Sequence, residues 1–365
     1  MAITRYFRRA YSSFVAHVFD IPARFAAFLL FLLLLILPLT GLSSYYLRML
    51  ISANILAIFA ASWDLLVGRT GQISLGHAIF YGMGGYSTAI LFKYFQLPIW
   101  ITIPLSLVIG TLVALLIGYP CLRVKGPYLA LVTMAFPIIL SGIVKWSPLI
   151  PIFGGEFGIR GLPAFFPFLP ILQQRMAEYY LVLILLFVSS VILYKIANSK
   201  TGIVLVSILD DEVASKASGI NVTKYKLIAI AISGLFGSLA GCLEAHLIKV
   251  ANPPMFGLTL SFTPIIVTFL GGIGTIYGPL IGAYIYYILD QYILTVLVPK
   301  LVTVPPWFDY AKLLIFSAIV LILVIKWPRG SARYATDKLE DLEEARDLDE
   351  RGPRIWKTYR RKKKE

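Results

Sequence analysis

The chain has 365 residues, of which 58% are hydrophobic and only 14% are charged, with a formal net charge of +14 at pH 7. Soluble domains carry about a quarter charged residues, so an ordinary soluble protein is excluded. Several apolar runs approach or exceed the roughly 20 residues that cross a bilayer core, and the alternating pattern of a membrane barrel is missing. The sequence therefore predicts an all-α, polytopic membrane protein.

We expect about ten membrane-spanning segments, some of them short or broken. Their approximate ranges are 23–42, 45–66, 76–93, 99–120, 126–144, 178–197, 225–248, 261–273, 278–297 and 308–326. The eighth segment is joined to the ninth through "GGIGTIYGP" (271–279), so this pair reads as one broken element. One side of the membrane carries roughly twice as many loop lysines and arginines as the other, which predicts that both termini are cytoplasmic.

The spans divide the chain into a basic N-terminus (1–22), a membrane domain (23–328) and a charged tail (329–365). We expect the first apolar run to be an uncleaved helix, because no convincing small-residue cleavage site follows it. The tail ends in "KTYRRKKK" (357–364). Such a cluster is typical of segments that bind anionic lipid, and equally of a disordered solubilising tail. Positive-inside bias and this tail account for most of the net charge, so no nucleic-acid partner is expected.

The outer loop from Lys145 to Ala177 contains "FGGEFGIRGLPAFFPFLP", whose glycines and prolines favour turns and short irregular pieces. A weak internal echo links "YGMGGYSTAI", which begins at Tyr81, with "YGPLIGAYIYYI", which begins at Tyr277. Both segments run outward in the expected topology, and transporters often contain repeats, so the echo suggests two parallel halves.

Residues that could carry enzymatic chemistry are few. The ionisable residues in or near the membrane lie close to span ends, where we expect them to reach water; they are Asp64, His77, Glu244, His246 and Asp290. HExxH and GxSxG motifs are missing, so no catalytic residue is expected. Cys121 and Cys242 read as small core residues, so we expect no metal site or cofactor in this chain. GxxxxGK[ST] is missing too, so any ATP must be bound by another chain.

The inner loop (198–224) predicts a short cytoplasmic helix of about eight residues. Asp210 can cap it, and Asp211 and Glu212 then lie in its first turn, where the helix dipole favours acids. A small apolar face follows at helical spacing, formed by Val213, Ala214 and Ala217. Gly219 comes next and suits the left-handed backbone position that ends a helix. A helix this short needs packing to be stable, either in a partner's groove or as an ordinary surface turn.

The stretch "TGQISLGHAIFYGMGGYSTAI" (70–90) combines polar residues and glycines inside an apolar region. Irregular backbone in a membrane is tolerated only where protein or a water-filled cavity surrounds it. We therefore expect a re-entry at the cytoplasmic side, with Gln72 and Ser74 pairing exposed backbone groups. "GMGG" (82–85) would let a neighbouring helix approach closely. His77 either lines a path or closes a hydrogen bond within the bundle.

Four stretches resemble the signatures of the branched-chain amino acid permease family of ABC importers, specifically its M-type subunit. They are "GQISLGHAIFYGMGGY", "LRVKGPYLALVTMAF", "DEVASKASGINVTKYKL" and "FLGGIGTIYGPLIGAY", and "GGEFGI" (154–159) resembles the family's outer-loop element. The resemblance covers about residues 45–328. Through its acidic start, small residues and glycine, the inner loop resembles the coupling loop of ABC importer permeases.

The resemblance implies a multi-pass protein of the prokaryotic inner membrane that pairs with an H-type paralogous permease. Two cytoplasmic ATPase subunits would bind ATP, and a periplasmic or lipid-anchored binding protein would deliver the amino acid. The resemblance also implies roles for individual residues. The short helix of the inner loop would couple this chain to the ATPase, and the translocation pathway would run beside the third span. The coupling residues are Asp211, Glu212, Ala214, Ala217 and Gly219, and the pathway residues are Gln72, Ser74, Gly76 and His77.

Two positions depart from the family pattern. Ile203 stands where a basic residue is usual, and Ser215 replaces the usual second alanine of the coupling motif. The loop is more apolar than the pattern, so docking would rely more on packing than on ion pairs. One alternative is a urea or short-chain amide importer, because the permeases of those importers are very similar. A second is an ion-coupled secondary transporter, which needs a titratable group deep in the bundle. A third is a membrane enzyme.

Overall fold

The computed structural model describes residues 31–124, 127–275 and 277–301, together with short stretches between 314 and 325. Four sequence predictions lie wholly or largely outside the described residues. They are the N-terminus (1–22), the beginning of the first span, most of the last span (308–326) and the charged tail (329–365).

Helices dominate the described part, and six stretches are long and apolar enough to cross a membrane. These stretches are Ser44–Thr70 (α3), Ile99–Cys121 (α5), Tyr128–Lys145 within α6 (Pro127–Lys145), Ile171–Ala197 (α8), Val222–Ile248 (α11) and Gly278–Lys300. The last one combines α13 (Gly278–Tyr287), the π-helical η5 (Ile288–Leu297) and the start of α14 (Val298–Leu301). Shorter apolar helices are Phe31–Thr40, which ends in η1 (Leu37–Thr40), and α12 (Leu258–Gly271); α4 (Ala78–Phe95) is a further helix, of 18 residues. The prediction of an all-α polytopic protein with some short or broken helices is confirmed.

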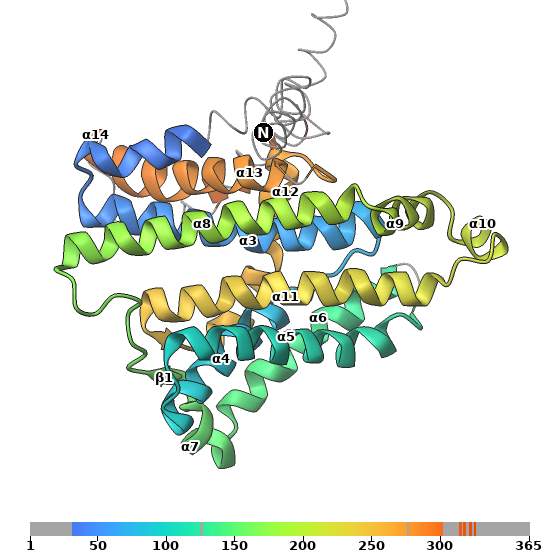
Figure 1. Cartoon of the computed structure of the whole chain (residues 1–365), viewed down its shortest axis with the longest axis horizontal. Helices are drawn as coiled ribbons and strands as arrows, with labels where there is room; N and C mark the ends of the chain where they lie inside the picture. The colour runs from blue at the N-terminus through green and yellow to red at the C-terminus, as the bar shows by residue number, and fades with distance from the viewer. Residues whose placement is uncertain are drawn as a thin grey trace, which may run out of the picture.

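Helix α3 is the centre of the bundle. It contacts α8, α11, α12 and α13 along its length, and it meets α9 (Lys200–Asp210) at its C-terminal end. Figure 1 shows α3 and α11 running side by side, with α4 and α5 against α11 and with α12 and α13 on the opposite side of α3. Nearly all of α3 from Asn54 to Val67 is buried, so this apolar helix is enclosed by protein rather than by lipid.

Close packing of α4, α5 and α11 depends on small residues. A Cβ added at Gly84 of α4 would collide with the carbonyl of Ser238 in α11, and one added at Gly241 of α11 would collide with the carbonyl of Tyr81. Gly110 of α5 meets the Ser238 side chain in the same way. Inside a membrane the hydrophobic effect does not drive helices together, so close contacts between small residues are what bring the backbones into contact. They confirm the prediction that "GMGG" admits a neighbouring helix.

Two helices are broken as the sequence predicts. The chain leaves α3 at Gly71, whose φ is +69°, and has irregular backbone until α4 begins at Ala78. A second break separates α12 from α13, where Gly272 and Gly274 both have positive φ. Glycine adopts these backbone conformations at no steric cost.

The outer loop forms short pieces, as predicted. They are η2 (Ser147–Leu149), α7 (Ile150–Phe153), η3 (Gly155–Phe157) and β1 (Ile159–Arg160), which pairs antiparallel with β2 (Val250–Ala251); η4 (Pro253–Phe256) follows β2. Helix α8 begins at Ile171, seven residues before the predicted start of the sixth span. Its first turns carry the charged residues Arg175 and Glu178, which pair at 2.9 Å and so let the helix extend.

The packing of α4 on α11 predicts unequal effects of two glycine-to-alanine changes. Gly241→Ala forces the two backbones apart and should destabilise the protein by about 1–3 kcal/mol. Gly142→Ala in α6 places its Cβ where no described atom lies within 4 Å, so it should be neutral or stabilise the protein by up to about 1 kcal/mol. Thermal unfolding in detergent measures both, and equal losses would contradict the close packing.

Candidate functional site

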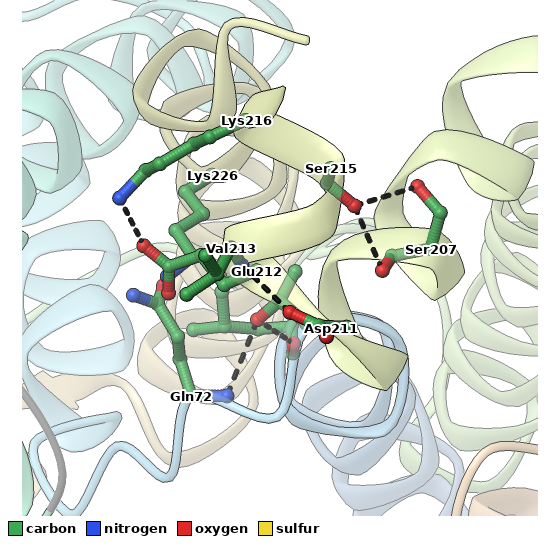
Figure 2. A network of polar contacts seen from close by, with 10 residues as sticks. Gln72, Ser207, Asp211, Glu212, Val213, Ser215, Lys216 and Lys226 are labelled. Atoms are coloured by element: carbon green, nitrogen blue, oxygen red, sulfur yellow. Dashed lines mark hydrogen bonds and ion pairs between the residues drawn. The ribbon is translucent and has the colours of Figure 1, made fainter. Parts of the chain in front are cut away.

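The candidate coupling element is the short helix α10 (Glu212–Ala217), which follows α9 and precedes α11. Figure 1 shows it projecting from the end of the molecule opposite α7 and β1. Asp211 is its N-cap, and one carboxylate oxygen accepts the Val213 and Ala214 N–H groups at 2.8 and 2.9 Å (Figure 2). Gly219 has φ +81° just beyond the end of the helix, as predicted.

The cap lies one residue later than the sequence suggested. Asp210 is the last residue of α9 rather than the cap, and Asp211 has the extended backbone (φ −154°, ψ 106°) that a cap requires. The reason is that α9 is itself an eleven-residue helix (Lys200–Asp210), capped by Ser199, whose side chain accepts the Gly202 N–H. Helix α9 was not predicted, because its apolar stretch "IVLVSIL" (203–209) contains no polar break that would mark a separate helix.

Ser215 fastens α10 to α9. It is the buried residue of α10, and its hydroxyl lies 2.9 Å from the carbonyl oxygen of Ser207 and 3.3 Å from the Ser207 hydroxyl (Figure 2). The residue that departs from the family pattern therefore has a specific role in this chain. An alanine would pack there but could not donate the hydrogen bond.

Glu212 pairs with two lysines, Lys216 within α10 and Lys226 on α11, and the second pair joins the two helices. Its two carboxylate oxygens lie 2.7 Å from the Lys216 and Lys226 ammonium nitrogens, and Lys226 is only 12% exposed (Figure 2). Hydrogen bonds from Lys216 and then Lys226 lower the pKa of Glu212 from 4.5 to about 2. The carboxylate is therefore ionised at every physiological pH and holds the base of α10 against α11.

The small apolar residues of α10 face outward. Val213 is 77% exposed, and Ala214 and Ala217 are exposed beside it. Ile203, on the preceding helix α9, is 66% exposed. With Ser215 bonded to α9 and Glu212 paired with Lys226, the exposed side chains of α10 form a free apolar face on an anchored helix, and a partner's groove could cover such a surface.

The predicted pathway residues lie in the irregular segment between α3 and α4. Four backbone N–H groups in this segment or directly after it donate to side-chain oxygens, as irregular backbone in a membrane requires. The acceptors are Thr70 for Gln72, Thr133 for Leu75, Ser74 for Gly76 and Ser261 for Ala78. The predicted role of Ser74 is confirmed. Thr133 and Ser261 were missed, because they are 58 and 183 residues away in sequence.

A small cavity of about 40 Å³ lies beside this segment, and Gln72, Ser74 and Gly76 line it together with Thr133. Ligand pockets usually measure about 300–1,000 Å³, so this cavity has room for water but not for an amino acid. Three of the four predicted pathway residues thus line the same cavity. Their contact with a substrate stays a prediction.

His77 does not line that cavity and is 0% exposed. Its ring lies between those of Phe59 and Phe80, with centroid distances of 5.0 and 5.1 Å. Its Nε2 lies 2.8 Å from the Ser62 hydroxyl, which itself donates to the Phe59 carbonyl oxygen. Because the Ser62 hydroxyl proton is used in that bond, Ser62 can only accept from His77, so the His77 Nε2 carries the proton and donates it. Of the two predicted roles, the geometry favours the hydrogen bond within the bundle.

The expectation that the ionisable residues reach water is wrong for Asp64 and His246 as well as His77. Asp64 is 1% exposed and accepts the Gly274 N–H. His246 is 0% exposed and bonds Thr88 at 3.0 Å and the Pro163 carbonyl at 3.0 Å. Distance from a span end does not indicate exposure here, because neighbouring helices and the outer loop cover the ends. Glu244 and Asp290 remain partly exposed.

The Thr133 contact predicts a specific loss of stability. Thr133→Val keeps the shape of the side chain but leaves the Leu75 N–H without its acceptor, which should cost about 1–3 kcal/mol. Thr111→Val is the matched control, because the Thr111 hydroxyl bonds only the Leu107 carbonyl of its own helix. Thermal unfolding compares the two, and an equal effect would show that Thr133 does not support the segment.

The Glu212 ion pairs predict a pH dependence. Because its pKa is lower in the folded chain, their contribution is complete above about pH 4.5 and disappears as the pH falls toward 2. A spin label on Val213→Cys should keep the same mobility from pH 8 to 5 and loosen below about 4. With Glu212→Gln as control, the label should be mobile throughout. Loosening between pH 7 and 5 would contradict the assignment.

Comparison with known proteins places this geometry in a family. The family described as the branched-chain amino acid transport system permease component matches residues 45–325. The high-affinity branched-chain amino acid transport system permease protein LivM of Salmonella typhimurium is 27% identical over 75% of this chain and 66% of its own length. The Escherichia coli LivM protein is 26% identical over the same shares. The chain thus spans about 66% of the length of these relatives.

Other relatives belong to the same wider group of permeases. A probable branched-chain amino acid transport permease protein LivH of Methanocaldococcus jannaschii is 26% identical over 67% of this chain and 78% of its own length. The ribose import permease protein RbsC of Escherichia coli is 34% identical, but over only 27% of this chain and 32% of its own length. No solved structure matches the chain. The match over residues 45–325 shows that this multi-pass membrane protein belongs to the branched-chain amino acid transport system permease component family.

Proposed function

We propose that this chain is one permease subunit of an ATP-driven importer that carries branched-chain or other hydrophobic amino acids across a prokaryotic inner membrane. The observation that carries the proposal is α10. A six-residue helix with an exposed apolar face is not stable alone, yet here a cap, a buried serine and two ion pairs hold it in place. A helix fixed in this way is suited to transmit force from a partner.

The partner that fits this face is a cytoplasmic ATPase subunit, two of which would serve the complete importer. The chain has no P-loop, so ATP would be bound and hydrolysed there, and this chain would need no cofactor of its own. The residues proposed to couple are Asp211 as cap, Glu212 as anchor, Ala214 and Ala217 on the docking face, and Gly219 as the end of the helix. In the proposed topology, α10 and both termini would lie in the cytoplasm.

A second permease of the H type would complete the path. Similarity of this chain to proteins named LivM and LivH supports pairing between related permeases. The cavity beside Gln72, Ser74 and Gly76 is too small for an amino acid, so the path would form between the two subunits or in another conformation. A periplasmic or lipid-anchored binding protein would select and deliver the substrate.

The deciding experiment uses the assembled complex in liposomes with its binding protein. Leucine, isoleucine and valine uptake that requires ATP would support the proposal. Uptake of urea or a short-chain amide instead would identify the alternative importer with the same mechanism. Uptake that persists without ATP and follows a proton gradient would refute an ATP-driven importer.

Coupling predicts the effect of two loop variants in the same assay. Glu212→Lys places a third cation beside Lys216 and Lys226, and Gly219→Pro cannot adopt the positive φ; either should lower uptake about tenfold or more while membrane insertion stays normal. Asp210→Lys is the matched control, because it reverses a charge on the exposed end of α9 outside these ion pairs. Normal uptake by both variants would show that α10 is not the coupling element.

A further inference from the structure

Asp64 is a buried acid to which the proposed function assigns no role. Asp64 lies in the last two turns of α3 and is 1% exposed. Its Oδ1 accepts the backbone N–H of Gly274 at 2.6 Å. Gly274 belongs to the break between α12 and α13 and has φ +77°. A single side chain of α3 thus holds the backbone of the second broken element.

The residue at position 68 permits the close approach that this hydrogen bond requires. Gly68 lies one turn after Asp64, and a Cβ added there would be 2.8 Å from the Gly274 Cα and 2.8 Å from the Asp64 carboxylate. The break can therefore approach α3 only because residue 68 is glycine. A hydrogen bond that is buried from water is electrostatically stronger than an exposed one. The bond should make α3 and the break move together.

The same end of α3 also contacts the cytoplasmic loop. Leu66 shares a buried apolar cluster with Leu205 of α9. A Cβ added at Gly71 would lie 2.7 Å from the Leu209 side chain, so the end of α3 meets the end of α9 directly. Helix α9 is in turn bonded to α10 through Ser215. A continuous set of contacts therefore leads from α10 through α9 and α3 to Gly274.

We propose that Asp64 is a positioning residue that transmits displacement of the cytoplasmic helices α9 and α10 to the α12–α13 break. The proposal rests on the proposed function, because it assumes that a partner moves α10. When α9 shifts, its packing on Leu66 and Gly71 displaces the end of α3, and the Asp64 carboxylate carries Gly274 with it. The break in α12–α13 is then the element whose conformation responds to the ATPase.

The test measures ATP hydrolysed per amino acid imported by the reconstituted complex. Asp64→Leu removes the acceptor at similar volume and should raise this ratio about tenfold, within the range of coupling between sites. Asp64→Asn keeps a carbonyl acceptor for the Gly274 N–H and should keep the ratio close to that of the native complex. An unchanged ratio in assembled Asp64→Leu would overturn the proposal.

A matched control separates coupling from simple stability. Asn54→Leu also removes a buried hydrogen bond between α3 and α13, the one that Tyr284 donates, but far from the cytoplasmic end. It should lower the Tm about as much as Asp64→Leu and leave the ratio of ATP to substrate unchanged. If both variants raise the ratio equally, Asp64 has only a structural role.

Hydrogen exchange in the native complex provides a second readout that needs no variant. The Gly274 amide should exchange slowly without nucleotide, and its exchange should change by about fivefold when nucleotide is trapped. Unchanged exchange at residues 272–275 would overturn the proposal even if Asp64→Leu failed to assemble. Absence of ATP-dependent uptake in the native complex would instead refute the proposed function, so the two failures are distinguishable.

Discussion

A backbone N–H that leaves a helix inside a membrane must find another acceptor, and this requirement organises the structure. Each unpaired group in hydrocarbon costs several kcal/mol. The chain breaks its helices twice, and in both places side chains supply the acceptors. Thr70, Ser74, Thr133 and Ser261 serve the first break, and Asp64 serves the second. The polar residues in these apolar regions are therefore the condition under which the helices can be broken.

Both breaks rest on the same part of α3. His77, at the end of the first break, bonds Ser62, and Gly274, in the second, bonds Asp64. Helices α4 and α13 then run from this level toward the beginning of α3, where the Phe59 ring meets Tyr81 of α4 and where Asn54 bonds Tyr284 of α13. Two helices that start alike and run the same way along one central helix are consistent with the parallel repeat suggested by the sequence.

Features set by local sequence could be predicted, and features set by distant contacts could not. The broken starts of α4 and α13 follow from glycines that no regular helix favours, and the end of α10 follows from Gly219. The first-break acceptors Thr133 and Ser261 could not be foreseen, since only folding brings them to the segment. Burial of His246 and Asp64 escaped prediction for the same reason. Span boundaries follow apolar runs, but a paired acid such as Glu178 extends a helix beyond the run.

Ser215 and Ile203, the two inner-loop residues at which the sequence differs from the expected pattern, can be explained by the way α10 is held. An exposed ion pair contributes at most about 1 kcal/mol, so Glu212 and Lys216 alone would orient a six-residue helix weakly. Lys226 is largely buried, and Ser215 adds a bond to α9, so the helix is fixed on two sides. Ile203 leaves the neighbouring surface apolar and uncharged. Charge thus orients the helix within this chain, while the contact proposed with a partner would depend on apolar packing, which salt weakens far less than it weakens surface ion pairs.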